Sequence, residues 1–150
     1  MTVARRISSN SSWESAMAYL VGYVVALVSF GAVDALWLSV MGPLLYRRTL
    51  GDILLADLRI GPAIAFYLVY PIGLLVLAVF PALKSGSIAA AIGSGVVLGA
   101  VCYATYDLTN FATLRNWTLQ LTLLDIAYGA IVSGFAAAAA FLAAHAVSGA

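Results

Sequence analysis

Apolar residues dominate four long stretches of this chain, at approximately residues 17–41, 62–83, 87–112 and 118–145. A helix needs about 20 consecutive apolar residues to cross the hydrocarbon core of a bilayer, and each stretch reaches that length. The pattern therefore predicts an all-α integral membrane protein with four transmembrane helices. The polar residues 1–15 that precede the first stretch are predicted to form a short flexible tail.

The links between the apolar stretches predict how the helices are arranged. The segments "PALKSGS" and "LRNW" are short, so the second, third and fourth helices should pack as antiparallel neighbours in a four-helix bundle. The first link, "GPLLYRRTLGDILLADLRIGP", is longer and mixes charged with apolar residues. Its leucines and isoleucine follow helical spacing at Leu50, Ile53, Leu54 and Leu58, which predicts a short helix lying in the headgroup region.

Composition supports a membrane protein and excludes several other classes. The chain has 150 residues, of which 64% are hydrophobic and 9% charged, and its mean hydropathy is +1.05. A soluble domain carries far more charge, and a 150-residue chain fits one domain, here a single membrane domain over residues 1–150. The net charge of +1 provides no basic surface for nucleic acid. Cys102 is the only cysteine, so no intrachain disulfide can form.

Polar residues interrupt the apolar stretches at one common depth. Asp34 precedes Pro43 by nine residues and Asp107 precedes Arg115 by eight, while Asp125 follows Trp117 by eight and Tyr70 follows Pro62 by eight. At 1.5 Å per residue, all four lie roughly 12 to 14 Å from the same membrane face. Because an aspartate in mid-membrane costs about 2.5 to 3.5 kcal/mol unless it finds partners, these residues are predicted to form one polar cluster.

Neighbours on the same helical faces extend the predicted cluster, because residues three or four apart lie side by side on a helix. The candidate ligand-binding residues are Asp34, Trp37, Tyr67, Tyr70, Tyr103, Asp107, Asn110, Asp125 and Tyr128. Small residues recur every four positions at Ala91, Gly95 and Gly99, which predicts close approach of another helix. The half of the bundle away from the polar cluster should therefore be tightly packed.

The residue types in the cluster restrict its chemistry. The set is rich in oxygen and lacks a second histidine or cysteines at metal-binding spacing, which disfavours haem, iron–sulfur and zinc sites. Hard cations usually take ligands from a loop of defined geometry, so neither a metal nor a cofactor is predicted. No phosphate loop or nucleophile motif is present in the sequence. Asp107, Asp125 and Asp34 remain candidates for general acid–base catalysis.

Several segments of the chain resemble a known family. "DALWL", "LYRRTLG", "FYLVYPIG", "YATYDLTNFATL" and "LLDIAYG" are similar to the bacterial predicted membrane proteins called domain of unknown function 2177. The resemblance covers most of the chain, from the first helix into the fourth. It implies a small, multi-pass protein of the bacterial inner (plasma) membrane and carries no established reaction.

Three classes of function follow from the intramembrane acids. The first is a pocket, open toward one leaflet, that binds or helps to modify a lipid or a hydrophobic small molecule. The second is a structural or accessory membrane subunit, whose polar network only stabilises the bundle. The third is a proton- or ion-coupled transporter that oligomerises, since four spans are few for transport. Membrane lipid, a second copy of the chain or another membrane protein are the partners these classes imply, and nucleic acid is not among them.

Overall fold

The computed structural model describes residues 2–148, and it contains helices but no strand in that part of the chain. Its helices are α1 (Thr2–Met41), α2 (Arg47–Leu50), α3 (Ile60–Leu74), α4 (Phe80–Ser85), α5 (Ile88–Thr113) and α6 (Leu119–Val147). π-helical turns join α1 to α2 (Gly42–Tyr46) and α3 to α4 (Leu75–Val79). A 3-10 turn, Gly51–Ile53, follows α2.

Four of the described helical segments are long and apolar enough to cross a membrane, as the sequence predicts. They are Ser15–Ile53, Ile60–Ser85, Ile88–Thr113 and Leu119–Val147. Large apolar side chains cover their outer surfaces, among them Leu36, Val97 and Ile131, which are all exposed. Apolar surfaces of this kind are compatible with contact to lipid tails. A helix also pairs its backbone N–H and C=O groups within itself, as the water-free membrane interior requires.

The first helix is longer than the sequence predicts. It begins at Thr2 and not near residue 17, so the backbone of residues 2–15 is helical where the sequence predicts a flexible tail, and Met1 lies outside the described residues. Residues 2–16 contain neither glycine nor proline, the residue types that most strongly oppose a helix. At its other end the helical span continues through Pro43, because a π-helical turn accommodates the missing N–H of this residue.

The separate interfacial helix between the first two spans is not confirmed. The helix containing Leu50 is α2, which directly continues the first span, and residues 54–59 are not helical. Gly51 has a φ of +56°, a conformation that glycine adopts without steric cost, and the chain changes direction there. Leu58 is 79% exposed.

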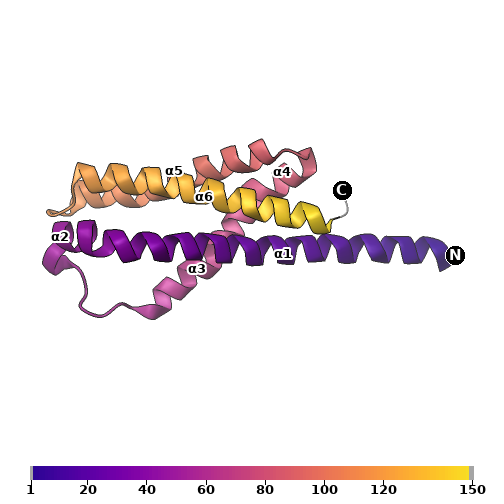
Figure 1. Ribbon diagram of the computed structural model, residues 1–150, viewed down its shortest axis with the longest axis horizontal. Coiled ribbons are helices and arrows are strands. Elements are labelled where there is room, and N and C mark those ends of the chain that lie inside the picture. The colour runs from indigo at the N-terminus through magenta and orange to yellow at the C-terminus, as the bar shows by residue number, and fades with distance from the viewer. Residues whose placement is uncertain (1, 149–150) are drawn as a thin grey trace.

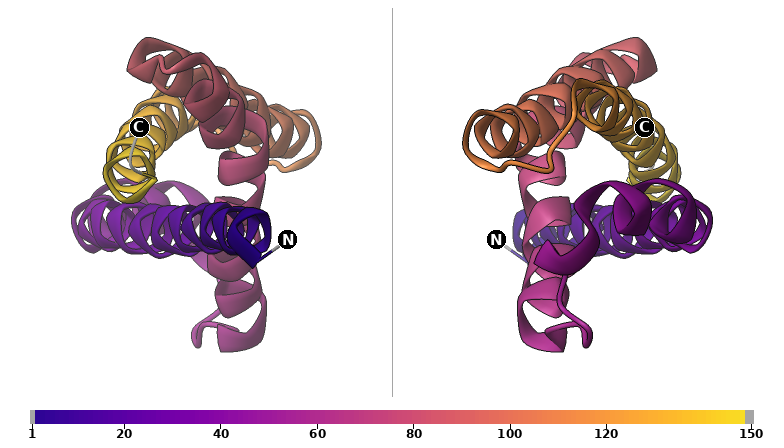
Figure 2. Two further views of the ribbon diagram at one scale, coloured as in Figure 1. Left: turned by 90° about the vertical axis from the view of Figure 1, so that its right-hand side faces the viewer. Right: turned by 90° about the vertical axis from the view of Figure 1, so that its left-hand side faces the viewer.

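The second span crosses the other three at a steep angle (Figures 1 and 2). Pro71 lies inside α3 and has no N–H to donate to the carbonyl of Tyr67, and the π-helical turn Leu75–Val79 follows one turn later. Both features bend helices. The first half of α3 extends away from the bundle (Figure 2). Further along the same span, Leu74, Leu75, Ala78 and Val79 are buried in the core.

Turn chemistry sets the sharp connections on either side of α5. Gly86 is left-handed, with a φ of +63°, and ends α4. Ser87 then caps α5, because its side chain accepts a hydrogen bond from the Ala90 N–H at 3.2 Å. Thr118 caps α6 in the same way, accepting from the Leu121 N–H at 3.2 Å. The second, third and fourth spans are therefore consecutive antiparallel neighbours, as predicted.

Helices α5 and α6 pack closely along the small-residue stripe, which confirms that prediction. A Cβ atom at Gly95 would lie 2.8 Å from the Cβ of Ala137, and one at Gly99 would lie 2.7 Å from the Cβ of Ser133. Alanines of α6, including Ala136 and Ala140, are fully buried in the same apolar core as Phe30 of α1. This half of the bundle is tight and apolar, and it fixes the position of the polar residues at the other half.

Candidate functional site

The carboxylate of Asp34 on α1 is bound by tyrosines from two other spans. Tyr67 on α3 donates a hydrogen bond to Oδ2, and Tyr128 on α6 donates to Oδ1 at 3.0 Å. Asp34 and Tyr128 are buried. Hydrogen bonds to a carboxylate are stronger than those between neutral groups, so this residue ties three of the four spans together.

A second carboxylate, Asp125 on α6, has its own donor. The hydroxyl of Tyr46, in the π-helical turn after α1, donates to Asp125 Oδ1 and accepts a hydrogen bond from the indole N–H of Trp37 at 2.9 Å. The result is a chain of donors that runs from Trp37 through Tyr46 to the acid. Asp125 is buried, so the chain compensates for the cost of placing its charge in the membrane.

An aromatic contact joins the two units. The rings of Trp37 and Tyr128 are stacked, with centroids 4.1 Å apart and planes inclined by 10°. Asp34 and Asp125 are also close enough to interact electrostatically. We call these six residues the aspartate cluster: Asp34, Trp37, Tyr46, Tyr67, Asp125 and Tyr128.

Asp107 on α5 differs from the other two acids. Its side chain is 0% exposed, yet neither carboxylate oxygen has a hydrogen-bond partner among the residues that the structure describes. It lies close enough to Asp125 for the two carboxylates to interact electrostatically. Buried polar groups without partners are rare in proteins and call for an explanation such as a functional role.

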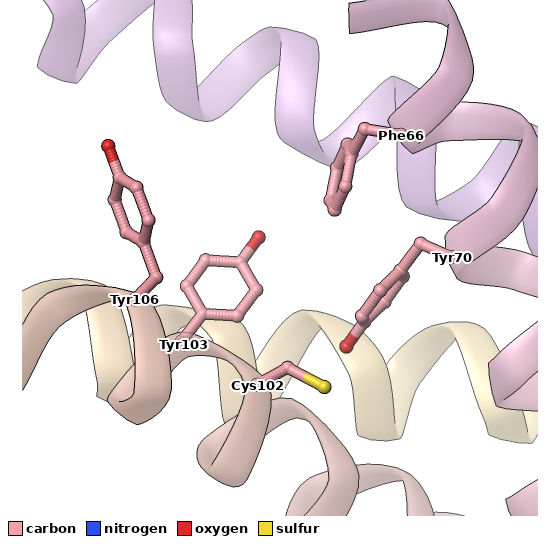
Figure 3. A pocket seen from close by; sticks show the side chains of 5 residues that line it. All are labelled: Phe66, Tyr70, Cys102, Tyr103 and Tyr106. Atoms are coloured by element: carbon pink, nitrogen blue, oxygen red, sulfur yellow. The ribbon is translucent and has the colours of Figure 1, made fainter. Parts of the chain in front are cut away.

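A pocket lies between α3 and α5 beside the aspartate cluster. Phe66 and Tyr70 from α3 and Cys102, Tyr103 and Tyr106 from α5 point into it (Figure 3). Its volume is about 410 Å³, and its walls are mainly aromatic. Phe66 and Tyr106 are 41% and 58% exposed, so the pocket opens at the lipid-facing surface. We call it the α3–α5 pocket.

A larger pocket of about 780 Å³ lies at the end of the bundle formed by α2 and the α5–α6 turn. We call it the end pocket. Tyr106 lines both pockets, and Tyr46 and Trp117 contribute to the wall of the end pocket. Because the Tyr46 hydroxyl is bonded to Asp125, the end pocket also adjoins the aspartate cluster.

The structure brings together most, but not all, of the residues selected from the sequence. Asp34, Trp37, Tyr67, Asp125 and Tyr128 meet in the aspartate cluster. Tyr103 lies at its edge, with its ring 6.1 Å from that of Tyr128 in an edge-to-face contact. Asp107 stands beside the cluster without a hydrogen-bond partner among the described residues.

Tyr70 and Asn110 lie outside the aspartate cluster, although Tyr70 lines the α3–α5 pocket. The Tyr70 hydroxyl is 2.6 Å from the Ser133 hydroxyl, and Ser133 is about 12 Å further along α6 than Asp125 at 1.5 Å per residue. The steep path of α3 places Tyr67, and not Tyr70, at the level of the acids. Asn110 is partly buried one turn beyond Asp107 and lines neither pocket.

Sequence reasoning missed Tyr46, Ser133 and three pocket residues, which are Phe66, Cys102 and Tyr106. The apolar pattern predicts that the first helix ends before Pro43, which leaves Tyr46 outside it, whereas the helical span continues through this proline and includes Tyr46. The pocket residues depend on how far α3 leans from α5, which no local pattern encodes. Among the described residues, no group of three or more His, Cys, Asp or Glu side chains could hold a metal ion.

Comparison with known proteins agrees with this architecture. Residues 19–142 match the family described as predicted membrane protein (DUF2177). The chain belongs to this family. No curated protein and no solved structure matches it. The matched residues include all of the aspartate cluster and all residues that line the two pockets, so the whole candidate site lies in the part of the chain that matches the family.

Proposed function

We propose that this DUF2177 protein binds a lipid or another amphiphilic small molecule between α3 and α5, in the bacterial inner membrane. The observation that carries the proposal is the shared wall at Tyr106. This residue lines both the aromatic α3–α5 pocket, within the membrane, and the more polar end pocket, so the two pockets are neighbours. An apolar cavity with a few polar groups at one end is the usual form of a site for such ligands.

The position of the α3–α5 pocket supports entry from the bilayer. Its lining residues Phe66 and Tyr106 are exposed on the surface that faces lipid, so a hydrocarbon chain could enter sideways without crossing the polar interface. The first half of α3 leans away from the bundle (Figure 2). Movement of this half of the helix would widen the opening, with the flexible point at Pro71.

The three acids lie behind the pocket walls and line neither pocket, but their neighbours do. Tyr103 lines the pocket and contacts Tyr128 of the aspartate cluster, and Asp107 is buried on the same helix with both oxygens unpaired among the described residues. A hydroxyl or amine of the ligand could donate to Asp107. Participation of this acid in proton transfer belongs to the same proposal.

Native mass spectrometry of the protein purified in mild detergent tests the proposal. We expect a specific bound species on the wild type that Cys102→Trp loses, because the larger side chain would fill the α3–α5 pocket. Ile131→Trp is the control, since it adds the same ring to an exposed, lipid-facing site on α6. A species retained equally by all three proteins, or no species on wild type after incubation with total membrane lipid, would show that the proposal is wrong.

A structural role is the second candidate, and the hydrogen bonds of Asp34 and Asp125 favour it. Both acids accept hydrogen bonds from tyrosines of the same chain, which is what a network that only ties helices together requires. Under this proposal the protein is an accessory subunit, and the pockets hold ordinary bilayer lipid without selectivity. The same mass-spectrometry experiment separates the two, because unselective lipid would be lost equally from wild type and Cys102→Trp on washing.

A further inference from the structure

The end pocket presents hydrogen-bond donors but no charged acceptor. Among the described residues that line it, Arg47 is the only charged side chain and none is acidic. The guanidinium group carries five N–H donors and accepts no hydrogen bond. An anion would therefore find a cation in the wall of this pocket and no carboxylate in that wall, and the nearby Asp125 is shielded from it by the Tyr46 hydroxyl.

Trp117 provides a second, independent observation at the same place. Its side chain is 6% exposed and lines the end pocket, and its indole N–H has no acceptor among the residues that the structure describes. An indole is only a donor, and a buried donor without an acceptor is unfavourable. A ligand oxygen at this position would supply the missing acceptor.

The third donor group in the pocket wall is already engaged. The hydroxyl of Tyr46 donates to Asp125 and accepts from Trp37, so it offers little to a ligand. The groups left for recognition are the guanidinium of Arg47, the indole N–H of Trp117 and the hydroxyl of Tyr106. Arg47 and Trp117 can only donate hydrogen bonds, so they favour an oxygen-bearing anion such as a phosphate or a carboxylate.

The rest of the wall shows that this anion should carry an apolar chain. Leu50, Ile53, Leu54 and Leu58 line the end pocket, and Tyr106 lines both this pocket and the neighbouring α3–α5 pocket. The end pocket also lies where the first span ends at Ile53 and the second begins at Ile60, the level of lipid headgroups. A free inorganic anion would not contact most of this apolar surface.

We propose that the end pocket binds the anionic headgroup of an amphiphile through Arg47 and Trp117, while the hydrocarbon chain lies in the α3–α5 pocket. This inference rests on the proposed function and deepens it, because it names the charge of the ligand and the residues that recognise this charge. Arg47 acts as the selective contact, since a guanidinium can donate two parallel hydrogen bonds to one phosphate or carboxylate.

The test compares three probes on the full chain in detergent by native mass spectrometry titration. The probes are dioleoylphosphatidylglycerol, which is anionic, dioleoylglycerol, which has the same chains without the phosphate, and inorganic phosphate. We expect wild type to bind the anionic lipid about tenfold more tightly than dioleoylglycerol, as a charge-assisted contact of about 1.4 kcal/mol would give. Inorganic phosphate at the same concentration should not compete.

Variants assign this selectivity to the pocket. Arg47→Gln should lower affinity for the anionic lipid about tenfold and leave dioleoylglycerol binding unchanged. The matched control is Arg48→Gln, which removes an equal charge from the next residue, an arginine that does not line the end pocket, and should change neither affinity. Trp117→Phe keeps an aromatic ring but removes the N–H, and it should weaken the anionic lipid only.

Each other outcome overturns the inference in a recognisable way. Equal affinity of wild type for the two lipids overturns the anionic headgroup but leaves the proposed function standing. Equal losses of affinity for the anionic lipid in Arg47→Gln and Arg48→Gln would mean that the overall positive charge attracts the lipid and that the end pocket does not recognise its headgroup. Competition by inorganic phosphate would identify a site for the free ion and not for an amphiphile. If neither lipid binds, the proposed function itself fails.

Discussion

Trp37 and Tyr128 stack face to face, with ring centroids 4.1 Å apart, and each is hydrogen-bonded within a different half of the aspartate cluster. Trp37 belongs to the unit around Asp125, and Tyr128 belongs to the unit around Asp34. The stack therefore makes one cluster of two hydrogen-bonded acids. It also links α1 to α6 at the level where the bundle is polar.

Removing the hydroxyl of Tyr128 while keeping its ring should weaken the cluster without disturbing the stack. Tyr128→Phe takes one donor from Asp34, so we expect the free energy of unfolding to fall by about 0.6 to 2 kcal/mol, the range for interhelical hydrogen bonds in membranes. Thermal unfolding in detergent measures this. Thr105→Val is the control, because that exposed hydroxyl bonds only the Val101 carbonyl of its own helix. Equal stability of the two variants would mean that the Asp34–Tyr128 bond contributes nothing.

Two substitutions at Asp34 separate charge from hydrogen bonding. Asp34→Asn keeps an oxygen acceptor for one tyrosine, whereas Asp34→Ala leaves the hydroxyls of both Tyr67 and Tyr128 without their acceptor. An unsatisfied buried hydroxyl costs about 1 to 3 kcal/mol, so the alanine variant should be clearly the less stable. We would compare midpoints of thermal unfolding and yields of folded protein. An asparagine variant as unstable as the alanine variant would show that the negative charge itself is required.

Close packing of α5 and α6 predicts opposite effects for two glycines of one helix. A Cβ at Gly99 would overlap the carbonyl oxygen of Gly129, whereas a Cβ at Gly93 would meet nothing within 4 Å. Gly99→Ala should therefore lower the free energy of unfolding by about 1 to 3 kcal/mol through overpacking. Gly93→Ala should be neutral or stabilising by up to about 1 kcal/mol, because alanine favours a helix. Similar unfolding midpoints for both variants would contradict the observed helix contact.

The four spans, the tight α5–α6 contact and the membership of the polar cluster were largely predictable from sequence. Span length follows from bilayer thickness, and the repeat of Ala91, Gly95 and Gly99 marks a face on which backbones approach. Depth along each helix is a simple count at 1.5 Å per residue. That count placed Asp34 and Asp125 at one level, where the structure has them in one cluster.

Rotation and tilt could not be predicted in the same way. Depth does not say which way a side chain points, so the count could not show that Asp125 finds a partner in Tyr46 while Asp107 finds none among the described residues. The count for the second span assumed an upright helix. The tilt of α3 instead brings Tyr67 to Asp34 and leaves Tyr70 with Ser133, and the same tilt opens the α3–α5 pocket.

The contrast between Asp107 and Asp125 gives the last prediction. An acid at the centre of a span costs about 2.5 to 3.5 kcal/mol on insertion scales, and Asp107 recovers none of this through hydrogen bonds within the described chain. Asp107→Leu should therefore keep or raise the free energy of unfolding, by at most about 3 kcal/mol. Asp125→Leu is the matched comparison and should lower it, because the Tyr46 hydroxyl would lose its acceptor.

Thermal unfolding and native mass spectrometry of the same two variants then separate stability from function at Asp107. A variant that is more stable than wild type but no longer carries the bound species would identify Asp107 as an acid kept for its ligand, since a destabilising group without a role has no reason to be buried there. A variant that is more stable and still carries the species would remove Asp107 from the proposed site. Loss of stability by more than about 1 kcal/mol would mean instead that the carboxylate stabilises the bundle, which would favour the structural role over ligand binding.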